Sequence, residues 1–146
     1  MSDFFDSMDV SASALSAERL RMNTISSNLA NAQTTRTAEG GPYRRKDPVF
    51  EAQPVDDFSR VLAGAMDVPL HKVKVVEVVS DQNAPKMVYQ PEHPDANPEG
   101  YVAMPNVNPM EEMVNLITAS RTYEANVTAM SVARNMMHRA LDIGRK

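Results

Sequence analysis

Apolar and small side chains recur at alternating steps of three and four along the first third of the chain. This spacing places them on one stripe of a helix. The stripe consists of Met8, Ala12, Leu15, Met22, Ile25, Leu29 and Ala32. Glu18 is the one charged side chain at a stripe position. The pattern predicts a helix over about residues 4–32.

A second stripe with the same spacing occupies the last third of the chain. Asn108 is a favourable helix cap, and Pro109 behind it suits the first helical turn, so a second helix is expected to begin there. The stripe consists of Met113, Leu116, Ser120, Tyr123, Val127, Met130, Arg134, Met137 and Leu141. Two long helices with such stripes favour an antiparallel, coiled-coil-like pair.

The middle of the chain is different because all ten prolines lie between Pro42 and Pro109. Runs rich in β-branched and aromatic residues predict strands near 43–50, 70–79, 86–90 and 101–104. A short helix is predicted over residues 58–66, and the proline-rich segment 90–108 is expected to be an extended connector. The cations of Arg44–Lys46 are expected on a strand edge, where charge discourages unwanted strand pairing; contact with an acidic partner is the alternative.

These elements predict an α+β fold that is mainly α, with a pair of long terminal helices and a small β-rich insert. The expected divisions are residues 1–35 for the N-terminal helix, 36–107 for the β-rich insert and connector, and 108–146 for the C-terminal helix. With 146 residues, the chain is long enough for one core of ordinary size and too short for two.

Composition argues against several classes of function. The net charge of −4 argues against a nucleic-acid partner held through its phosphates. The chain has no cysteine, which excludes disulfides and thiolate metal sites. No apolar run reaches the roughly 18–20 residues of a membrane span. The acidic first residues also do not resemble a cleaved signal peptide.

The candidate catalytic and metal-binding residues do not form a recognisable site. His71, His93 and His138 fall in a strand, a loop and a helix, without the spacing of a helical metal pair. Glu92 and Asp95 flank one of these histidines, so a hydrolase acting on cell wall through this carboxylate pair is one interpretation. The neighbouring prolines favour a solvated loop instead. We therefore predict no catalytic, cofactor-binding or metal-binding residue and no small-molecule substrate.

The first helix carries small residues over most of its circumference. A two-helix hairpin in water would need a broad charged face, so this composition indicates close neighbours on more than one side. We interpret those neighbours as other subunits; the alternative is that both helices pair within one molecule under the β-rich insert. The predicted assembly interface is Met8, Leu15, Met22, Ile25 and Leu29 on the first helix and Met113, Leu116, Tyr123, Val127, Met130, Met137 and Leu141 on the second.

Several motifs resemble a known family. Segment 25–34, Ile-Ser-Ser-Asn-Leu-Ala-Asn-Ala-Gln-Thr, resembles the N-terminal signature of bacterial flagellar rod and hook proteins. Segments 41–50, 100–107, 112–114 and 119–127 look like those of the FlgC-type proximal rod proteins. The motif and helix-end residues are Asn28, Asn31, Gly41, Pro42, Tyr43, Arg44, Pro105, Asn106, Arg121 and Asn126. Asn28 and Asn31 are expected to satisfy backbone groups where the first helix ends.

The resemblance implies a structural subunit of the flagellar basal-body rod. Such a protein is expected to be made in the cytoplasm, exported by the flagellar type III apparatus without a cleaved signal peptide, and assembled helically in the periplasm. The implied partners are other copies of itself, other rod proteins and the adaptor proteins between MS ring and rod. The alternative function is a soluble coiled-coil adaptor or export chaperone of a secretion system.

Overall fold

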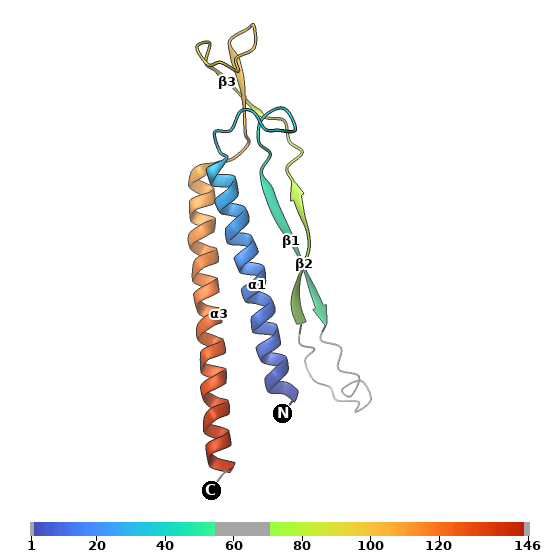
Figure 1. Ribbon diagram of the computed structural model, residues 1–146, viewed down its shortest axis with the longest axis vertical. Coiled ribbons are helices and arrows are strands. Elements are labelled where there is room, and N and C mark those ends of the chain that lie inside the picture. Colours follow the sequence, from blue (N-terminus) through green and yellow to red (C-terminus); the bar gives the residue numbers. More distant parts are fainter. Residues whose placement is uncertain (1, 55–70, 145–146) are drawn as a thin grey trace. The chain divides into compact units, whose positions relative to one another are not determined.

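The computed structural model describes residues 2–54 and 71–144. In this part of the chain, two long helices, α1 (Ser2–Ala30) and α3 (Pro109–Gly144), bracket four strands. The strands are β1 (Lys46–Pro54), β2 (His71–Ser80), β3 (Lys86–Tyr89) and β4 (Tyr101–Met104), and they form two small antiparallel sheets (Figure 1). The prediction of an α+β fold that is mainly α is therefore confirmed.

The two helices begin and end close to their predicted positions. α3 begins at Pro109, and Asn108 caps it, because the Asn108 Oδ1 accepts a hydrogen bond of 3.1 Å from the Met110 N–H. α1 ends at Ala30, slightly before the expected residue 32. The short helix predicted over residues 58–66 lies outside the described residues.

The first sheet pairs β1 with β2. β1 begins later than predicted because the residues before it form a closed loop. Gly40 and Gly41 adopt φ values of 87° and 80°, which side chains with a Cβ rarely tolerate. The Tyr43 N–H then donates to the Thr34 carbonyl at 3.0 Å and closes the loop. The closed loop thus brings the start of β1 back to the end of α1.

The second sheet is a hairpin, so the prediction of an extended connector over residues 90–108 is wrong. Its register pairs Lys86 with Met104, Met87 with Ala103, Val88 with Val102 and Tyr89 with Tyr101. The chain turns back between the strands because the Asn97 Oδ1 accepts hydrogen bonds from the N–H groups of Glu99 and Tyr101. The prolines of this segment fit the turns between the strands.

The chain divides into two compact units. Among the described residues, unit 1 consists of 2–19, 50–54, 71–76 and 120–144, and unit 2 consists of Leu20–Val49 and Glu77–Ala119. Each unit thus takes part of both long helices and part of the first sheet. The sequence-based divisions at 35/36 and 107/108 follow element boundaries instead, and they stay a prediction.

α1 is partly covered by the rest of the molecule. In unit 1, the Val73 N–H of β2 donates to the Ser13 Oγ at 3.1 Å, and Lys72 forms an ion pair with Asp9. In unit 2, Ile25 is buried. A strand of the same molecule thus contacts one side of α1, and the interpretation that other subunits cover the rest stays a prediction.

α3 is covered along one stripe only. A set of less exposed side chains repeats at heptad steps: Glu112, Leu116, Ala119, Tyr123, Asn126, Met130, Ala133 and Met137. The predicted stripe shares four of these members, but its alternate members Met113, Val127 and Leu141 are exposed. The reason is that small residues such as Ala119 allow close approach of a neighbouring segment, whereas sequence reasoning favoured the large apolar residues beside them.

Candidate functional site

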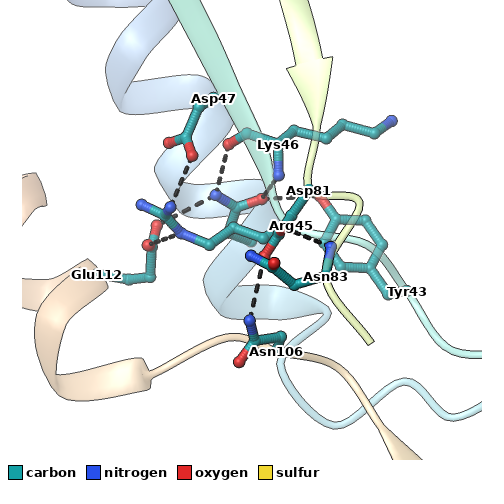
Figure 2. Close-up of polar contacts among 9 residues, drawn as sticks. Tyr43, Arg45, Lys46, Asp47, Asp81, Asn83, Asn106 and Glu112 are labelled. Atoms are coloured by element: carbon teal, nitrogen blue, oxygen red, sulfur yellow. Dashed lines mark hydrogen bonds and ion pairs between the residues drawn. The ribbon is translucent and has the colours of Figure 1, made fainter. Parts of the chain in front are cut away.

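A polar cluster with a buried centre joins the end of α1 to the starts of β1 and α3, all within unit 2 (Figure 2). We call it the junction cluster, and its members are Asn28, Tyr43, Arg45, Lys46, Asp47 and Glu112. Asn28 is at its centre, with 0% of its surface exposed. Its Nδ2 donates to the Lys46 carbonyl at 2.8 Å and to the Glu112 Oε2 at 3.2 Å. One amide side chain therefore connects three elements.

The other side of the Asn28 amide is also satisfied. Its Oδ1 accepts the Lys46 N–H at 2.9 Å and the Tyr43 hydroxyl at 3.0 Å. An amide buried without these partners would cost about 1–3 kcal/mol, so the four contacts make the cluster a specific fit for Asn. The prediction for Asn28 thus needs correction, since it satisfies the backbone of β1 and not that of α1.

Arg45 and Glu112 form the charged half of the cluster. The Arg45 Nε is 2.7 Å from the Glu112 Oε1, and its Nη1 is 2.6 Å from the Asp47 Oδ2. Only 1% of Glu112 is exposed. Desolvation lowers the pKa of Arg45, but the hydrogen bond to Glu112 and the negative charges nearby outweigh it and raise the pKa above its usual value. The guanidinium is thus the fixed counter-charge of a buried carboxylate.

A second, exposed polar group lies beside the cluster in Figure 2. The Asp81 side chain accepts hydrogen bonds from the Asn83 N–H at 2.9 Å and from the Asn106 Nδ2 at 3.1 Å. The bond from the Asn83 backbone is the main reason that the pKa of Asp81 is lowered, with the Asn106 contact and the charge of Arg45 adding to it. Asn106 thereby holds the segment that leads into α3 against the end of β2.

The remaining motif residues have local roles. Asn31 ends α1 as predicted, because its Nδ2 donates to the Ser27 carbonyl at 2.9 Å. Gly41 takes the left-handed conformation in the closed loop, with Pro42 beside it. Arg44 is exposed and donates to the Asp81 carbonyl at 3.3 Å, whereas Pro105 is buried. These residues shape the backbone around the junction cluster.

Of the six members of the cluster, the sequence analysis selected Asn28 and Tyr43 and missed Arg45, Lys46, Asp47 and Glu112. Arg45 was assigned with its neighbours to a charged strand edge, which is wrong for this residue because it pairs with Glu112. Glu112 was quoted only as part of a motif. The two are 67 positions apart, and neither helical nor strand periodicity relates positions at that distance. Their presence inside two family-like motifs was the one signal that could have found them.

The predicted interface residues fall into two groups. On α1, Ile25 is buried, while Met8, Leu15, Met22 and Leu29 are partly exposed. On α3, four lie on the less exposed stripe, Leu116, Tyr123, Met130 and Met137, together with the motif residue Asn126. Met113, Val127, Leu141 and the motif residue Arg121 are exposed. Whether these residues form an interface stays a prediction.

Sequence reasoning overlooked most of the exposed apolar surface of α3. Beyond the predicted members, the exposed large apolar side chains are Met110, Val114, Ile117, Val132, Met136 and Ile143. Several of them recur at helical steps on a second face, and counting exposed positions outside the first stripe could have found them. In the described parts of the chain, neither helix is long and apolar enough to cross a membrane. No group of three or more histidines and carboxylates gathers there.

The chain is similar to known proteins along nearly its whole length. A family model described as "Flagella basal body rod protein" matches residues 8–36, and one described as "Flagellar basal body rod FlgEFG protein C-terminal" matches residues 99–143. The flagellar basal-body rod protein FlgC of Bacillus subtilis is 46% identical over 148 residues, which cover 97% of this chain and 98% of the relative.

Two further relatives carry the same description. FlgC of Aquifex aeolicus is 39% identical over 143 residues, covering 97% of this chain and 98% of the relative. FlgC of Salmonella typhimurium is 40% identical over 136 residues, covering 93% and 94%. The chain belongs to the FlgC family of flagellar basal-body rod proteins. As a member of the FlgC family, it is a structural subunit of the basal-body rod and assembles with other rod components.

The family assignment gives the junction cluster a clear place in the FlgC chain. The matched segment 8–36 contains Asn28, and the matched segment 99–143 contains Glu112. These two residues are hydrogen-bonded to each other. The two rod-protein segments of the chain therefore meet at the junction cluster, with Arg45 supplied from the intervening region.

Proposed function

We propose that this FlgC-family chain acts in the rod through an antiparallel, coiled-coil-like pairing of α1 and α3, with the exposed side of α3 packed against neighbouring subunits. The exposure of α3 is the observation that carries the proposal. Nine large apolar side chains of this helix are exposed: Met110, Met113, Val114, Ile117, Val127, Val132, Met136, Leu141 and Ile143. Covering them removes apolar surface from water, which favours association.

The chemistry of these side chains supports neighbours of more than one kind. Met110, Met113 and Met136 are unbranched and adapt their shape to different contacts. A rod built from several related proteins presents different surfaces above and below a given subunit. In this proposal, residues 1–35 and 108–146 form the helical layer, including the predicted interface residues, and residues 36–107 form the insert beside it.

We further propose the route and the partners that family membership suggests. The chain is made in the cytoplasm, exported by the flagellar type III apparatus and assembled in the periplasm with copies of itself, other rod proteins and the adaptors between MS ring and rod. Its role is mechanical, since it transmits torque and lines the export channel without making or breaking a bond.

The experiment places one charge on each helix. Leu29→Asp alters the partly exposed side of α1, and Val127→Asp alters a position on α3 that is 44% exposed. Each variant replaces the FlgC-family protein of a motile bacterium. Its incorporation into isolated basal bodies and the swimming of the cells are then measured. We expect both variants to lose incorporation, because an uncompensated charge in a packed seam costs several kcal/mol.

Ser131→Asp is the matched control, because Ser131 is exposed on α3 and carries no apolar surface. This variant should swim normally, and it shows that an added charge on the helix is tolerated for export and folding. Normal incorporation of Val127→Asp would contradict the proposed packing of α3 against its neighbours.

A further inference from the structure

The hairpin of β3 and β4 exposes an apolar face that the described part of the chain does not cover. Its strand register places four residues on this face: Met87, Tyr89, Tyr101 and Ala103. We call it the hairpin face. The first three side chains are exposed, whereas Val102, on the opposite face, is 1% exposed. A two-stranded hairpin with one buried face normally carries polar residues on the other, so the composition of the hairpin face is unusual.

The hairpin face is rigidly built. The rings of Tyr89 and Tyr101 pack edge to face, with their centroids 5.3 Å apart. Gly100 has a φ of 83°, and a Cβ at this position would lie 2.8 Å from the Tyr89 Cε2. The absence of a side chain at Gly100 therefore lets the tyrosine ring lie against the backbone. A fixed aromatic surface loses little entropy when a partner covers it.

The surroundings of the hairpin face are acidic. Glu92, Asp95 and Glu99 are exposed in the loop that connects the two strands. The sequence contains no lysine or arginine between Lys86 and Arg121. A partner that covers the hairpin face must therefore bring positive charge to its edge, because like charges at the rim of an interface oppose association.

The same unit carries a surface with the complementary chemistry. Arg36 and Arg44 in the loop before β1 and Lys46, the first residue of β1, are exposed, and we call this segment the basic loop. Two of these cations, Arg44 and Lys46, border a hollow that Pro42 and Tyr43 also line, together with the single carboxylate of Glu39. The Lys46 ammonium lies 6.0 Å from the centre of the Tyr43 ring. The basic loop thus combines an aromatic and proline floor with a positive rim, as the hairpin face requires.

Contacts within the described part of the chain do not pair the carboxylates beside the hairpin face with the cations of the basic loop, so both sets of charges can bind a partner. Asp95 accepts a hydrogen bond from the Thr35 hydroxyl at 2.8 Å, which connects the two loops without using a cation. In the described residues no ion pair joins Glu92, Asp95 or Glu99 to a cation of the basic loop. Both surfaces belong to unit 2, so one copy presents both of them together.

We propose that the hairpin face of one copy docks on the basic loop of a second copy of this chain. The two surfaces differ, so the contact is head-to-tail, and such contacts build rings or open helical arrays. The occupant is a second copy because the chain itself supplies both the apolar, acidic half and the basic half. That this contact forms within the helical rod rests on the proposed function. The contact itself rests on the opposite charges and the apolar surfaces of the two partners.

Single cysteines test this contact directly, because the natural sequence has none. Glu99→Cys and Arg44→Cys are made on separate chains and expressed together in a motile bacterium that lacks its own copy. Basal bodies are isolated, oxidised and separated without reductant. We expect a mixed disulfide dimer of the two variants and little dimer when either variant is expressed alone. Glu77→Cys with Arg44→Cys is the control, because Glu77 is exposed on β2, away from the hairpin face.

Exchanging the two opposite charges supplies an independent test of the same contact. Here a short cross-linker traps neighbouring copies in the basal body, and the yield of cross-linked dimer is measured. Glu99→Lys alone or Arg44→Glu alone should lower the yield of cross-linked copies by about tenfold, and the two together should restore it. Chains that enter basal bodies without forming the mixed dimer would overturn the inference and leave the proposed function intact. Chains that fold but never enter basal bodies would overturn the proposed function, and mixed dimer formed by them in solution would still support the contact.

Discussion

The two long helices of this chain are covered to very different extents. α1 contacts β2 through Ser13 and Asp9 in unit 1, and it contributes the buried residues Ile25 and Asn28 to unit 2. α3 has only Glu112 and Ala119 buried among its described side chains. Both helices carry an apolar stripe in sequence, yet among the described side chains α1 has the larger share buried.

This difference separates two sources of stability. The end of α1 and the first turns of α3 depend on contacts within unit 2, where the junction cluster supplies buried hydrogen bonds. The rest of α3 has one partly covered stripe and exposes apolar side chains elsewhere. In the FlgC family member described here, we therefore expect substitutions on α1 to act on folding and substitutions on the outer side of α3 to act on assembly.

The largest expected effect comes from the same change made once on each helix. Ile25 is 6% exposed and Ile117 is 55% exposed. Ile25→Asp should lower the free energy of unfolding by about 3–5 kcal/mol, because it buries an unpaired charge. Ile117→Asp should change it by no more than about 0.5 kcal/mol. Urea unfolding of the purified chains measures both, and equal losses would remove the contrast between the helices.

The next largest effect on the free energy of unfolding is expected at Arg45 in the junction cluster, with its neighbour Arg44 as the comparison. Arg45→Ala leaves the Glu112 carboxylate buried without its counter-charge, and we expect a loss of about 2–3 kcal/mol, reduced by the partial exposure of the guanidinium. Arg44→Ala removes exposed hydrogen bonds only and should cost less than about 1 kcal/mol. Thermal unfolding of the two variants compares them.

A double substitution serves as the control for this pair. Glu112→Gln keeps a polar group beside Asn28 but needs no counter-charge. Combined with Arg45→Ala, it should therefore cost clearly less than the sum of the two single changes. Strict additivity would show that the ion pair does not connect the start of β1 to α3.

The smallest expected difference in the free energy of unfolding is between two threonines that make the same backbone hydrogen bond. Thr24 on α1 and Thr118 on α3 each donate their hydroxyl to the carbonyl four residues earlier, at 2.9 Å. Thr24 is buried, so Thr24→Ala should cost about 1 kcal/mol through lost packing. Thr118→Ala should be within about 0.5 kcal/mol of the parent, since alanine favours the helix. A larger loss at Thr118 in urea unfolding would argue that α3 is enclosed like α1.

Local signals predicted the parts of the fold that depend on neighbouring residues. The cap at Asn108 and the sharp loop at Gly40 and Gly41 follow from side-chain and backbone chemistry within a few positions. The strands β3 and β4 were predicted, but their pairing in a hairpin was missed because the turn depends on one side chain, Asn97, and the prolines around it favoured an extended connector. Half of the α3 stripe was misplaced because small residues such as Ala119 carry no apolar signal.

The candidate site was less predictable for a physical reason. Asn28, Arg45 and Glu112 meet only after the chain has folded, and no periodicity relates positions so far apart. Asn28 was selected because it belongs to a motif at the end of a helix, but its predicted role was local. The exposed side of α3 was partly predicted, because a helix repeats its faces at regular steps, yet sequence alone did not indicate which face the molecule covers.

Hydrogen exchange tests the central claim that α3 finds its missing cover in neighbouring subunits. Amide exchange over residues 120–144 is measured in the dilute, purified chain and in isolated basal bodies. The account predicts rapid exchange in the dilute chain, strong protection in the rod, and protection of Leu20–Val49 in both. Strong protection of residues 120–144 in the dilute chain, unchanged in the rod, would contradict it and favour a self-sufficient coiled-coil adaptor or export chaperone.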